Sequence, residues 1–262
     1  MTASLLASAQ AHLDMLQPRA HVPFSANSRT VVVLLRSGAW IPGVRIESAS
    51  YALTITALSN AITTAYTLGH AEDMVGVVSS TPLSDAEQTY LQAIDAFRTP
   101  TFNESYTACW QPKALPNQLE DAVDPTTDAP LSTADGIETA RDVAQYAHIP
   151  ESSFPVGAIL VSATGAAFPG VNVEHPDWNR ILCAERNALS TAYAYGHTNY
   201  TALYLSCPKA ANGSPCGACR QVLAERATDA VIYMDRHAAP PEETSPRALL
   251  PAFFNSSDLV AD

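Results

Sequence analysis

The chain carries two successive copies of one alternation of hydrophobic patterns. In each copy, apolar side chains at helical spacing come first, in residues 4–15 and 137–147. A short apolar run typical of a buried strand, a glycine-containing turn, a helix ending near a glycine and a further strand-like run follow in the same order. Strands that alternate with helices in this way predict two α/β domains. The strand-like runs are residues 31–35, 74–78, 158–161 and 202–205, and the turn glycines are Gly38 and Gly165.

An internal repeat relates the two copies residue by residue. When residues 41–70 are placed over residues 168–197, a shift of 127 without gaps, twelve of thirty positions are identical. Average composition would give about two matches by chance, so we interpret the chain as a duplication. Several prolines and little apolar periodicity between the copies indicate a linker. The predicted boundaries are residues 1–112 for the first domain, 113–130 for the linker and 131–262 for the second domain.

The charge balance narrows the classes of partner. The chain has 26 acidic and 14 basic residues, a formal net charge of −12 at pH 7, whereas a nucleic-acid-binding surface needs clustered lysine and arginine. No apolar run reaches the roughly 18 residues that cross a bilayer, and the first residues lack the basic region of a secretory signal. Five cysteines, three of them at metal-type spacing, suit a reducing cytosol. We expect a cytoplasmic protein with neither a nucleic-acid nor a membrane partner.

Two short cysteine motifs in the second copy carry the candidate chemistry. Cys183 begins a Cys-Ala-Glu-Arg motif, and 33 residues later Cys216 begins the Cys-Gly-Ala-Cys of a Pro-Cys-Gly-Ala-Cys-Arg-Gln motif, whose second cysteine is Cys219. Three thiolates can hold a zinc ion and leave one coordination position open for water. Glu185, two residues after the first thiol, could then handle the protons of that water. The pattern predicts an enzyme with one zinc ion per chain.

The first copy lacks these residues. Thr56 occupies the place of the first cysteine and Leu58 that of the glutamate. When six extra residues are allowed, Leu83 and Ala86 meet the other two cysteines. Without thiols or the carboxylate, this copy is predicted to bind no zinc in this way and to be catalytically silent.

These motifs resemble those of the zinc-dependent cytidine deaminases that act on free nucleosides, in a two-domain form. The likeness covers nearly all of residues 131–262 and, more faintly, residues 1–110, and it includes a Phe-Pro-Val-Gly-Ala element at Phe154 and an Asn-Val-Glu element from Asn172 to Glu174. The resemblance implies that Phe154, Asn172 and Glu174 contact the nucleoside, the latter two through ribose hydroxyls. It also implies an α/β fold of two tandem three-layer α/β/α domains, each a mixed sheet of about five strands flanked by helices.

Members of that family borrow site residues from neighbouring domains, which implies roles for three more residues. The family's Ala-x-Tyr element survives in the silent copy as Ala49 and Tyr51, whereas the zinc copy has Pro176 and Trp178 there. We infer that the silent copy lends Ala49 and Tyr51 to a zinc site, in its own chain or in a partner chain. The family's C-terminal aromatic residue matches Phe254. The resemblance therefore implies a homodimer of two-domain chains, a pseudo-tetramer.

The implied reaction is hydrolytic deamination of cytidine or deoxycytidine to the uracil nucleoside and ammonia, as in pyrimidine salvage. Glu185 would pass a proton from water to the ring N3 and then protonate the departing amine. Three thiolates bring −3 to an ion of +2, so compensating positive charge is needed. Cys183 and Cys216 are each expected to begin a helix whose N-terminus faces sulfur. Arg186 is expected to donate to the thiolates, unless it forms a surface ion pair instead.

The same residues leave alternatives open. Cys207 would close a structural zinc site if it supplied a fourth sulfur, although its place after an apolar strand favours a buried thiol. Cys109 has no evident role and is also expected to be a buried thiol. The residues from His175 to Trp178 either reshape the pocket for a modified cytosine nucleoside of the antibiotic type or pack against the silent copy. A protein that binds nucleosides without turnover is a further alternative, as is a nucleic-acid-editing enzyme, which the charge disfavours.

Overall fold

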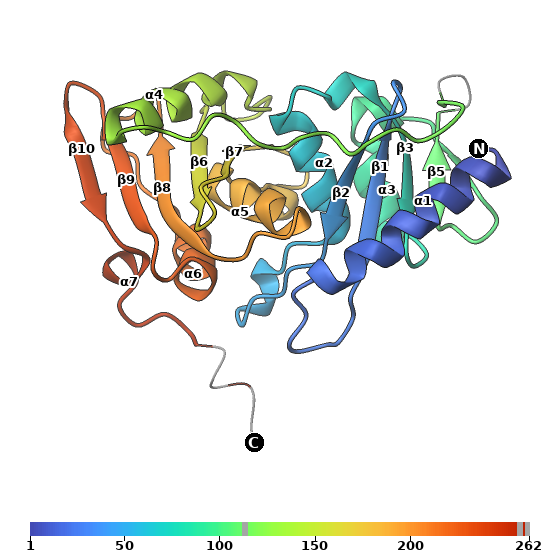
Figure 1. Cartoon of the computed structure of the whole chain (residues 1–262), viewed down its shortest axis with the longest axis horizontal. Helices are drawn as coiled ribbons and strands as arrows, with labels where there is room; N and C mark the ends of the chain where they lie inside the picture. The colour runs from blue at the N-terminus through green and yellow to red at the C-terminus, as the bar shows by residue number, and fades with distance from the viewer. Residues whose placement is uncertain (112–114, 256–258, 260–262) are drawn as a thin grey trace.

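Two five-stranded sheets, with helices on both faces of each, form the computed structural model, which describes residues 1–111, 115–255 and 259 (Figure 1). The first sheet has the spatial order β2 (Trp40–Val44), β1 (Thr30–Leu35), β3 (Met74–Ser79), β5 (Ala108–Trp110), β4 (Thr101–Phe102). The second has the order β10 (Ala239–Thr244), β9 (Val231–Arg236), β8 (Tyr200–Ser206), β6 (Gly157–Ser162), β7 (Ala167–Val171). The helices are α1 (Ala3–Leu16), α2 (Ala57–Thr67), α3 (Asp85–Gln92), α4 (Thr133–Val143), α5 (Ala184–Ala194), α6 (Gly217–Arg226) and α7 (Pro246–Leu249).

The predicted repeat is confirmed in the order of these elements. Helix, two antiparallel strands, helix, strand and helix succeed each other as α1 to α3 in the first half and as α4 to α6 in the second. α1 lies on one face of the first sheet and α4 on one face of the second, both toward the viewer in Figure 1. The opposite faces are covered by α2, against β1 and β2, and by α5, against β6 and β7.

The two halves meet through α2 and α5, which pack against each other in the centre of the molecule. Thr64 Oγ1 lies 2.8 Å from Thr191 Oγ1, and these two residues are 127 positions apart. Because the repeat shift is also 127, a pseudo-twofold axis passes between them, as at the centre of an isologous dimer interface. Asn187 adds a buried hydrogen bond across the seam, from Nδ2 to Thr67 Oγ1 at 2.7 Å. Since unpaired polar groups are costly to bury, these bonds fix the register of the halves.

Each half places a glycine where a helix touches its sheet. A Cβ atom on Gly43 would lie 2.1 Å from the carbonyl oxygen of Ala57, and one on Gly170 would lie 2.2 Å from that of Ala184. Only glycine permits this approach, which brings the first turns of α2 and α5 onto β2 and β7. The strand β7 thereby sets the position of the start of α5.

Replacing Gly170 with alanine is expected to displace the start of α5 and to lower the free energy of unfolding by about 2 kcal/mol. Gly43→Ala is the matched control, since it creates the same clash in the half that lacks the cysteine motifs. Both variants should unfold at lower urea concentration, but only Gly170→Ala should also lose zinc affinity in a chelator competition. Equal zinc affinity in the two variants would show that zinc binding does not depend on the position of the start of α5.

Strand pairing differs between the halves. β8 and β9 are parallel, and the other pairs of the second sheet are antiparallel, so this sheet is mixed as expected. In the first sheet all the described pairs are antiparallel. The reason lies after the third helix: α6 crosses directly from β8 to β9, whereas the first half inserts β4 between α3 and β5, so the chain returns in the opposite direction.

The segment between the halves follows the edges of both sheets. Ala122 forms a bridge with Trp40 on the edge strand β2, and Thr127 forms one with Ala167 on the edge strand β7. Tyr195 Oη also donates to the carbonyl of Val123 at 2.7 Å. The composition of this segment predicts a linker but does not predict these contacts, which cover the outer edges of β2 and β7.

An ion pair fastens α4 to the second sheet. Arg141 donates through Nε and Nη2 to the two carboxylate oxygens of Asp235, both at 2.7 Å, and Ser206 Oγ donates to the same carboxylate at 2.8 Å. Burial alone would raise the pKa of Asp235, but the hydrogen bonds from Arg141, His237 N and Ser206 outweigh it and lower that pKa to about 2.

Asp235→Asn should therefore lower the free energy of unfolding by about 2 kcal/mol at neutral pH. The folded pKa of about 2 lies below the reference value of 3.8. The stabilisation is thus complete above about pH 4 and lost as the pH falls toward 2. Urea unfolding of both proteins at several pH values measures this difference, and a gap between them that does not shrink on acidification would contradict it.

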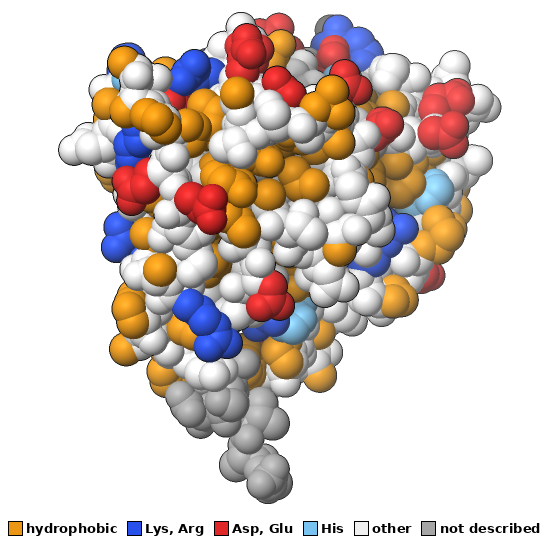
Figure 2. All heavy atoms as spheres, turned by 60° about the vertical axis from the view of Figure 1, so that its left-hand side comes forward, with side chains coloured by type: hydrophobic (Ala, Val, Ile, Leu, Met, Phe, Trp, Pro, Cys, Tyr) orange, Lys and Arg blue, Asp and Glu red, His pale blue; other side chains and the backbone are white. Residues whose placement is uncertain are grey.

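The described helices include none long and apolar enough to span a membrane. On the face shown in Figure 2, acidic and basic side chains are interspersed, and no extended basic patch gathers on it.

Candidate active site

Three cysteine thiols converge at the N-termini of two helices of the second half. Cys183 is the N-cap residue of α5 and Cys216 that of α6, as predicted, and Cys219 lies in the first turn of α6. The Sγ atoms of Cys183 and Cys216 are 3.7 Å apart, and those of Cys216 and Cys219 are 3.6 Å apart. Tetrahedral zinc with Zn–S bonds of about 2.3 Å requires sulfur separations of about 3.8 Å. The donor set therefore fits a zinc ion.

The described residues provide no fourth protein ligand to this cluster. Among the described residues, no other histidine, cysteine, aspartate or glutamate joins the three sulfurs as a potential ligand. Cys207 stays outside the group as a buried thiol, and burial raises its pKa to about 11. The alternative of a closed four-sulfur site is therefore wrong for this structure. Cys109 is likewise buried, on β5, and burial raises its pKa to about 12.

Positive charge and helix dipoles face the sulfurs. The N-termini of α5 and α6 both point at the cluster because two of its cysteines cap them. Arg186 Nη2 lies 4.0 Å from Cys183 Sγ and 3.3 Å from the carbonyl oxygen of Ile181. Arg220 instead donates to Pro215 O and Ser214 Oγ and so braces the loop before Cys216.

Glu185 lies in the first turn of α5 and is 3% exposed. Burial, assisted by negative charge at Cys216, raises the pKa of its carboxyl above the ordinary range, and a hydrogen bond with the Cys219 thiol opposes this rise. A buried carboxyl whose pKa is raised holds its proton more readily than an exposed one, which suits a group that must accept a proton and return it.

The three predicted nucleoside-contacting residues form a second group. Asn172 Oδ1 accepts from Val156 N at 2.8 Å and its Nδ2 donates to Phe154 O at 2.9 Å, so its side chain holds the backbone on both sides of residue 155. The Phe154 side chain is left 37% exposed. An exposed aromatic ring on a fixed backbone can stack against a planar base.

Glu174 is held by a loop that the sequence analysis did not single out. Its carboxylate accepts from Glu151 N at 2.8 Å, from Ser152 N at 3.1 Å and from Ser152 Oγ. Burial alone would raise its pKa, but these hydrogen bonds lower it. Ser152 could have been found from sequence, because a His-x-Pro-x-Ser element occurs at His148 and again 127 residues earlier, at His21.

The first copy keeps this loop but has an ion pair beside it. Glu47 accepts from Phe24 N, Ser25 N and Ser25 Oγ, the repeat equivalents of the donors to Glu174. In place of Asn172, however, Arg45 donates to Glu47 from Nε at 3.0 Å.

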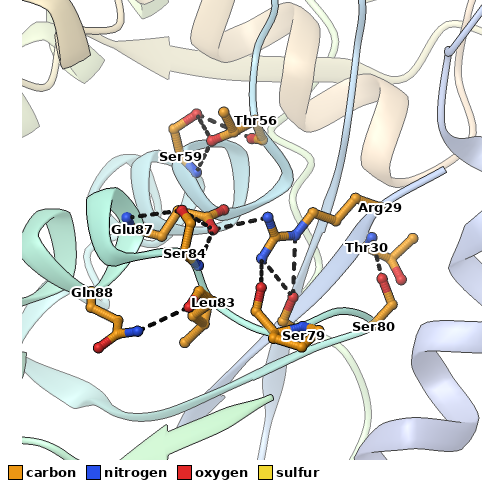
Figure 3. Close-up of polar contacts among 11 residues, drawn as sticks. Arg29, Thr30, Thr56, Ser59, Ser79, Ser80, Leu83, Ser84, Glu87 and Gln88 are labelled. Carbon is orange, nitrogen blue, oxygen red and sulfur yellow. Dashed lines mark hydrogen bonds and ion pairs between the residues drawn. The ribbon is translucent and has the colours of Figure 1, made fainter. Parts of the chain in front are cut away.

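The place equivalent to the metal cluster is shown in Figure 3. There Arg29 Nη1 lies 2.8 Å from Glu87 Oε2, and Ser84 Oγ donates to the same carboxylate oxygen at 2.8 Å. The Thr56 hydroxyl bonds only to Ser59 in the contacts described. One ion pair thus occupies the region where the second copy has its thiols.

Ala49, Tyr51 and Phe254 lie together. They line a groove of about 850 Å³ that also includes Phe24 and Leu259. The described lining of this groove includes none of the three clustered cysteines. Tyr51 is 87% exposed, which leaves its ring available to another surface.

Helix α6 anchors this groove. Ala49 N donates to Glu225 Oε2 at 2.9 Å and Ser48 Oγ to Glu225 Oε1 at 2.8 Å. Gln221 Nε2 donates to Phe254 O at 2.7 Å and to Glu225 Oε1 at 2.6 Å. Gln221 and Glu225 were not predicted, because their partners lie in the other half or at the C-terminal end.

His175 and Trp178, which differ from the residues of the resembled family, differ in burial. His175 is buried and stacks on Tyr90 of the silent half, with ring centroids 4.7 Å apart. The prediction that it packs against that half is confirmed. Trp178 is 66% exposed and does not share this burial.

Comparisons with known proteins place these features in a family. The model of the cytidine and deoxycytidylate deaminase zinc-binding region matches residues 132–235, which include all three cysteines. The cytidine deaminase of Sporosarcina psychrophila is 36% identical over 124 residues, 47% of this chain and 91% of that protein. The probable cytidine deaminase of Dictyostelium discoideum is 36% identical over 128 residues, 48% of this chain and 85% of that protein. A crystal structure of cytidine deaminase from Burkholderia pseudomallei is 34% identical and covers 47% of this chain and 100% of its own, with a TM-score of 0.45. Because the chain spans most of the length of relatives that are more than 30% identical to it, it belongs to the cytidine deaminase family.

Proposed function

We propose that this protein hydrolyses cytidine and deoxycytidine to uridine and deoxyuridine with release of ammonia, using one zinc ion per chain. The observation that carries the proposal is the thiol cluster: three sulfurs at zinc spacing, free of a fourth protein ligand among the described residues, with the buried Glu185 beside them. Membership of the cytidine deaminase family supports the substrate class.

Each residue of the cluster has a task in this proposal. Cys183, Cys216 and Cys219 hold zinc, which when bound lowers the pKa of water and so supplies a nucleophile at neutral pH. Glu185 takes one proton from water and delivers it to N3 of the cytosine ring. It then takes the second proton of that water, from the hydroxyl now on C4, and gives it to the departing amine. Its burial supports this role, because a shielded carboxyl is protonated more readily than an exposed one and can then return that proton. Arg186 offsets the excess negative charge of three thiolates.

The second group positions the nucleoside. Phe154 stacks on the base, and Asn172 and Glu174 contact the ribose hydroxyls. The lowered pKa of Glu174 keeps its carboxylate ionised as a hydrogen-bond acceptor, which supports this assignment. Asn172 also fixes the backbone that carries Phe154.

The silent half serves as scaffold and as donor of contacts. Its ion pairs Arg29–Glu87 and Arg45–Glu47 support the assignment of residues 1–112 as a non-catalytic domain, joined by residues 113–130 to the catalytic domain of 131–262. The exposed groove with Ala49, Tyr51 and Phe254 is then a surface that completes the site of a partner chain, in a homodimer of two-domain chains. The five cysteines form no disulfide bond, which supports a location in the reducing cytoplasm. The role in pyrimidine salvage follows from the proposed substrates.

The deciding experiment follows the loss of cytidine absorbance in the ultraviolet with purified protein, together with the ammonia released. Turnover of cytidine and deoxycytidine supports the proposal. Faster turnover of an aminoacyl cytosine nucleoside would replace the substrate class, and tight cytidine binding without ammonia would make the protein a nucleoside-binding protein. Sedimentation of the protein with and without substrate tests the homodimer.

A further inference from the structure

The catalytic half contains a loop extension that the silent half lacks. Eight residues separate Ser206, the end of β8, from Pro215, whereas two residues separate Ser79, the end of β3, from the equivalent Pro82. The six additional residues belong to the segment 207–214, here called the extended loop. Because the two copies otherwise share their elements, the extended loop is expected to serve a task that only the zinc-binding copy has.

The extended loop is anchored at its base. Arg236 Nη1 donates to Gly213 O at 2.7 Å and to Ala211 O at 3.1 Å, and His237 Nε2 lies 3.2 Å from Cys207 O. The loop also carries two internal turn bonds, Ala210 N to Cys207 O and Gly213 N to Ala210 O. Because this loop is held at its base, its other side chains can restrict the movement of the segments that they contact.

Lys209 of this loop contacts the loop that holds Glu174. Its Nζ lies 2.5 Å from the carbonyl oxygen of Ser153. Ser153 has φ +53°, a left-handed conformation that is unfavourable for a residue with a side chain. It lies directly between Ser152, which donates twice to Glu174, and Phe154. Lys209 thus holds the backbone between the serine that binds Glu174 and the residue Phe154.

The silent copy shows why such a restraint is needed. Its loop also has a left-handed residue, Ala26 at φ +53°, and the glutamate that holds the loop, Glu47, is paired with Arg45. In the catalytic copy Asn172 replaces that arginine, so this ion pair is absent. Lys209 supplies a cation that contacts the loop itself, at the carbonyl of Ser153.

We propose that Lys209 is a positioning residue for nucleoside binding, which keeps Phe154 and Glu174 in place by holding the carbonyl of Ser153. The expected change in KM rests on the proposed function, whereas the expected change in loop mobility does not depend on turnover. Lys209 touches neither the sulfurs nor Glu185 in the described contacts, so its effect falls on nucleoside affinity and not on the metal.

The test compares Lys209→Met, which keeps the length of the side chain, with Lys209→Arg, which keeps the charge. We expect Lys209→Met to raise KM for cytidine roughly three- to ten-fold with kcat changed less than about two-fold, and Lys209→Arg to recover most of this. Arg98→Met controls for the loss of one positive charge, because Arg98 is an exposed residue of the silent half, paired with Asp95. Zinc content and the unfolding midpoint should match those of the wild type in all three variants.

Amide hydrogen exchange of residues 150–156 provides the readout that needs no activity. Exchange there should accelerate in Lys209→Met and not in Arg98→Met. Unchanged exchange overturns the proposal, as does an unchanged KM in an active enzyme, or a loss of zinc. If the wild-type protein fails to deaminate cytidine while exchange still accelerates, the proposed function falls and the positioning role stands.

Discussion

Replacement of Glu185 by glutamine is expected to abolish deamination while leaving the fold and the metal site in place. Glutamine has nearly the shape of glutamate, so the buried position in the first turn of α5 is preserved. It cannot take up and return a proton, however, and loss of general acid–base catalysis costs roughly 10²- to 10⁴-fold in rate. The measurement is the initial rate of absorbance loss with saturating cytidine.

Two further measurements separate the chemical role of Glu185 from a structural one. Zinc per chain and the unfolding midpoint should equal those of the wild type, because the thiols are untouched. The matched control is Glu87→Gln, which makes the same change in a buried glutamate of the silent half. It weakens the ion pair with Arg29 and so lowers stability, but it should leave kcat unchanged. Substantial activity in Glu185→Gln would remove Glu185 from the proton shuttle.

The order of elements could be predicted from the sequence because it depends on local patterns. The repeat of 127 residues predicted that the two halves share their first strands and helices, and they do. The placement of Cys183 and Cys216 at helix starts was also predictable, since each precedes a helical run. In both cases a few adjacent residues contain the information.

Pairing and packing across the chain could not be predicted in the same way. The antiparallel pairing of β3 with β5 depends on where the chain returns after α3, and no residue in either strand specifies it. The bonds from Ser48 and Ala49 to Glu225 join residues more than 170 positions apart. Such contacts become apparent only when the two halves are docked through α2 and α5.

The candidate site shows the same division. The thiols and Glu185 lie within short motifs whose chemistry is specific, whereas the residues that support them are ordinary in sequence. Ser152 holds Glu174, and only the recurrence of the His-x-Pro-x-Ser element in both copies distinguishes this serine in the sequence. The first copy illustrates the point further, because Arg29 and Glu87 form an ion pair where the other copy has its thiols. Glu87 belongs to a capping box with Ser84, but that motif does not predict the pairing with Arg29.

Cys219→Ser is expected to remove zinc and activity together. Cys219 is fully buried in the first turn of α6, with its neighbour Cys216 Sγ 3.6 Å away, so a hydroxyl there must replace a thiolate in a set of three. Serine is a much poorer zinc ligand than cysteine, and two remaining thiolates do not hold the ion against competing chelators. The wild type should contain one zinc per chain by elemental analysis and the variant less than about a tenth of that.

Cys207→Ala is the matched control for this substitution, because Cys207 is a buried thiol of the same half that lies outside the cluster. It should retain one zinc per chain and full activity, since no sulfur of the cluster is changed. Two zinc ions per wild-type chain would show that the first half also binds metal. That result would overturn the view that the Arg29–Glu87 ion pair has replaced a metal site there.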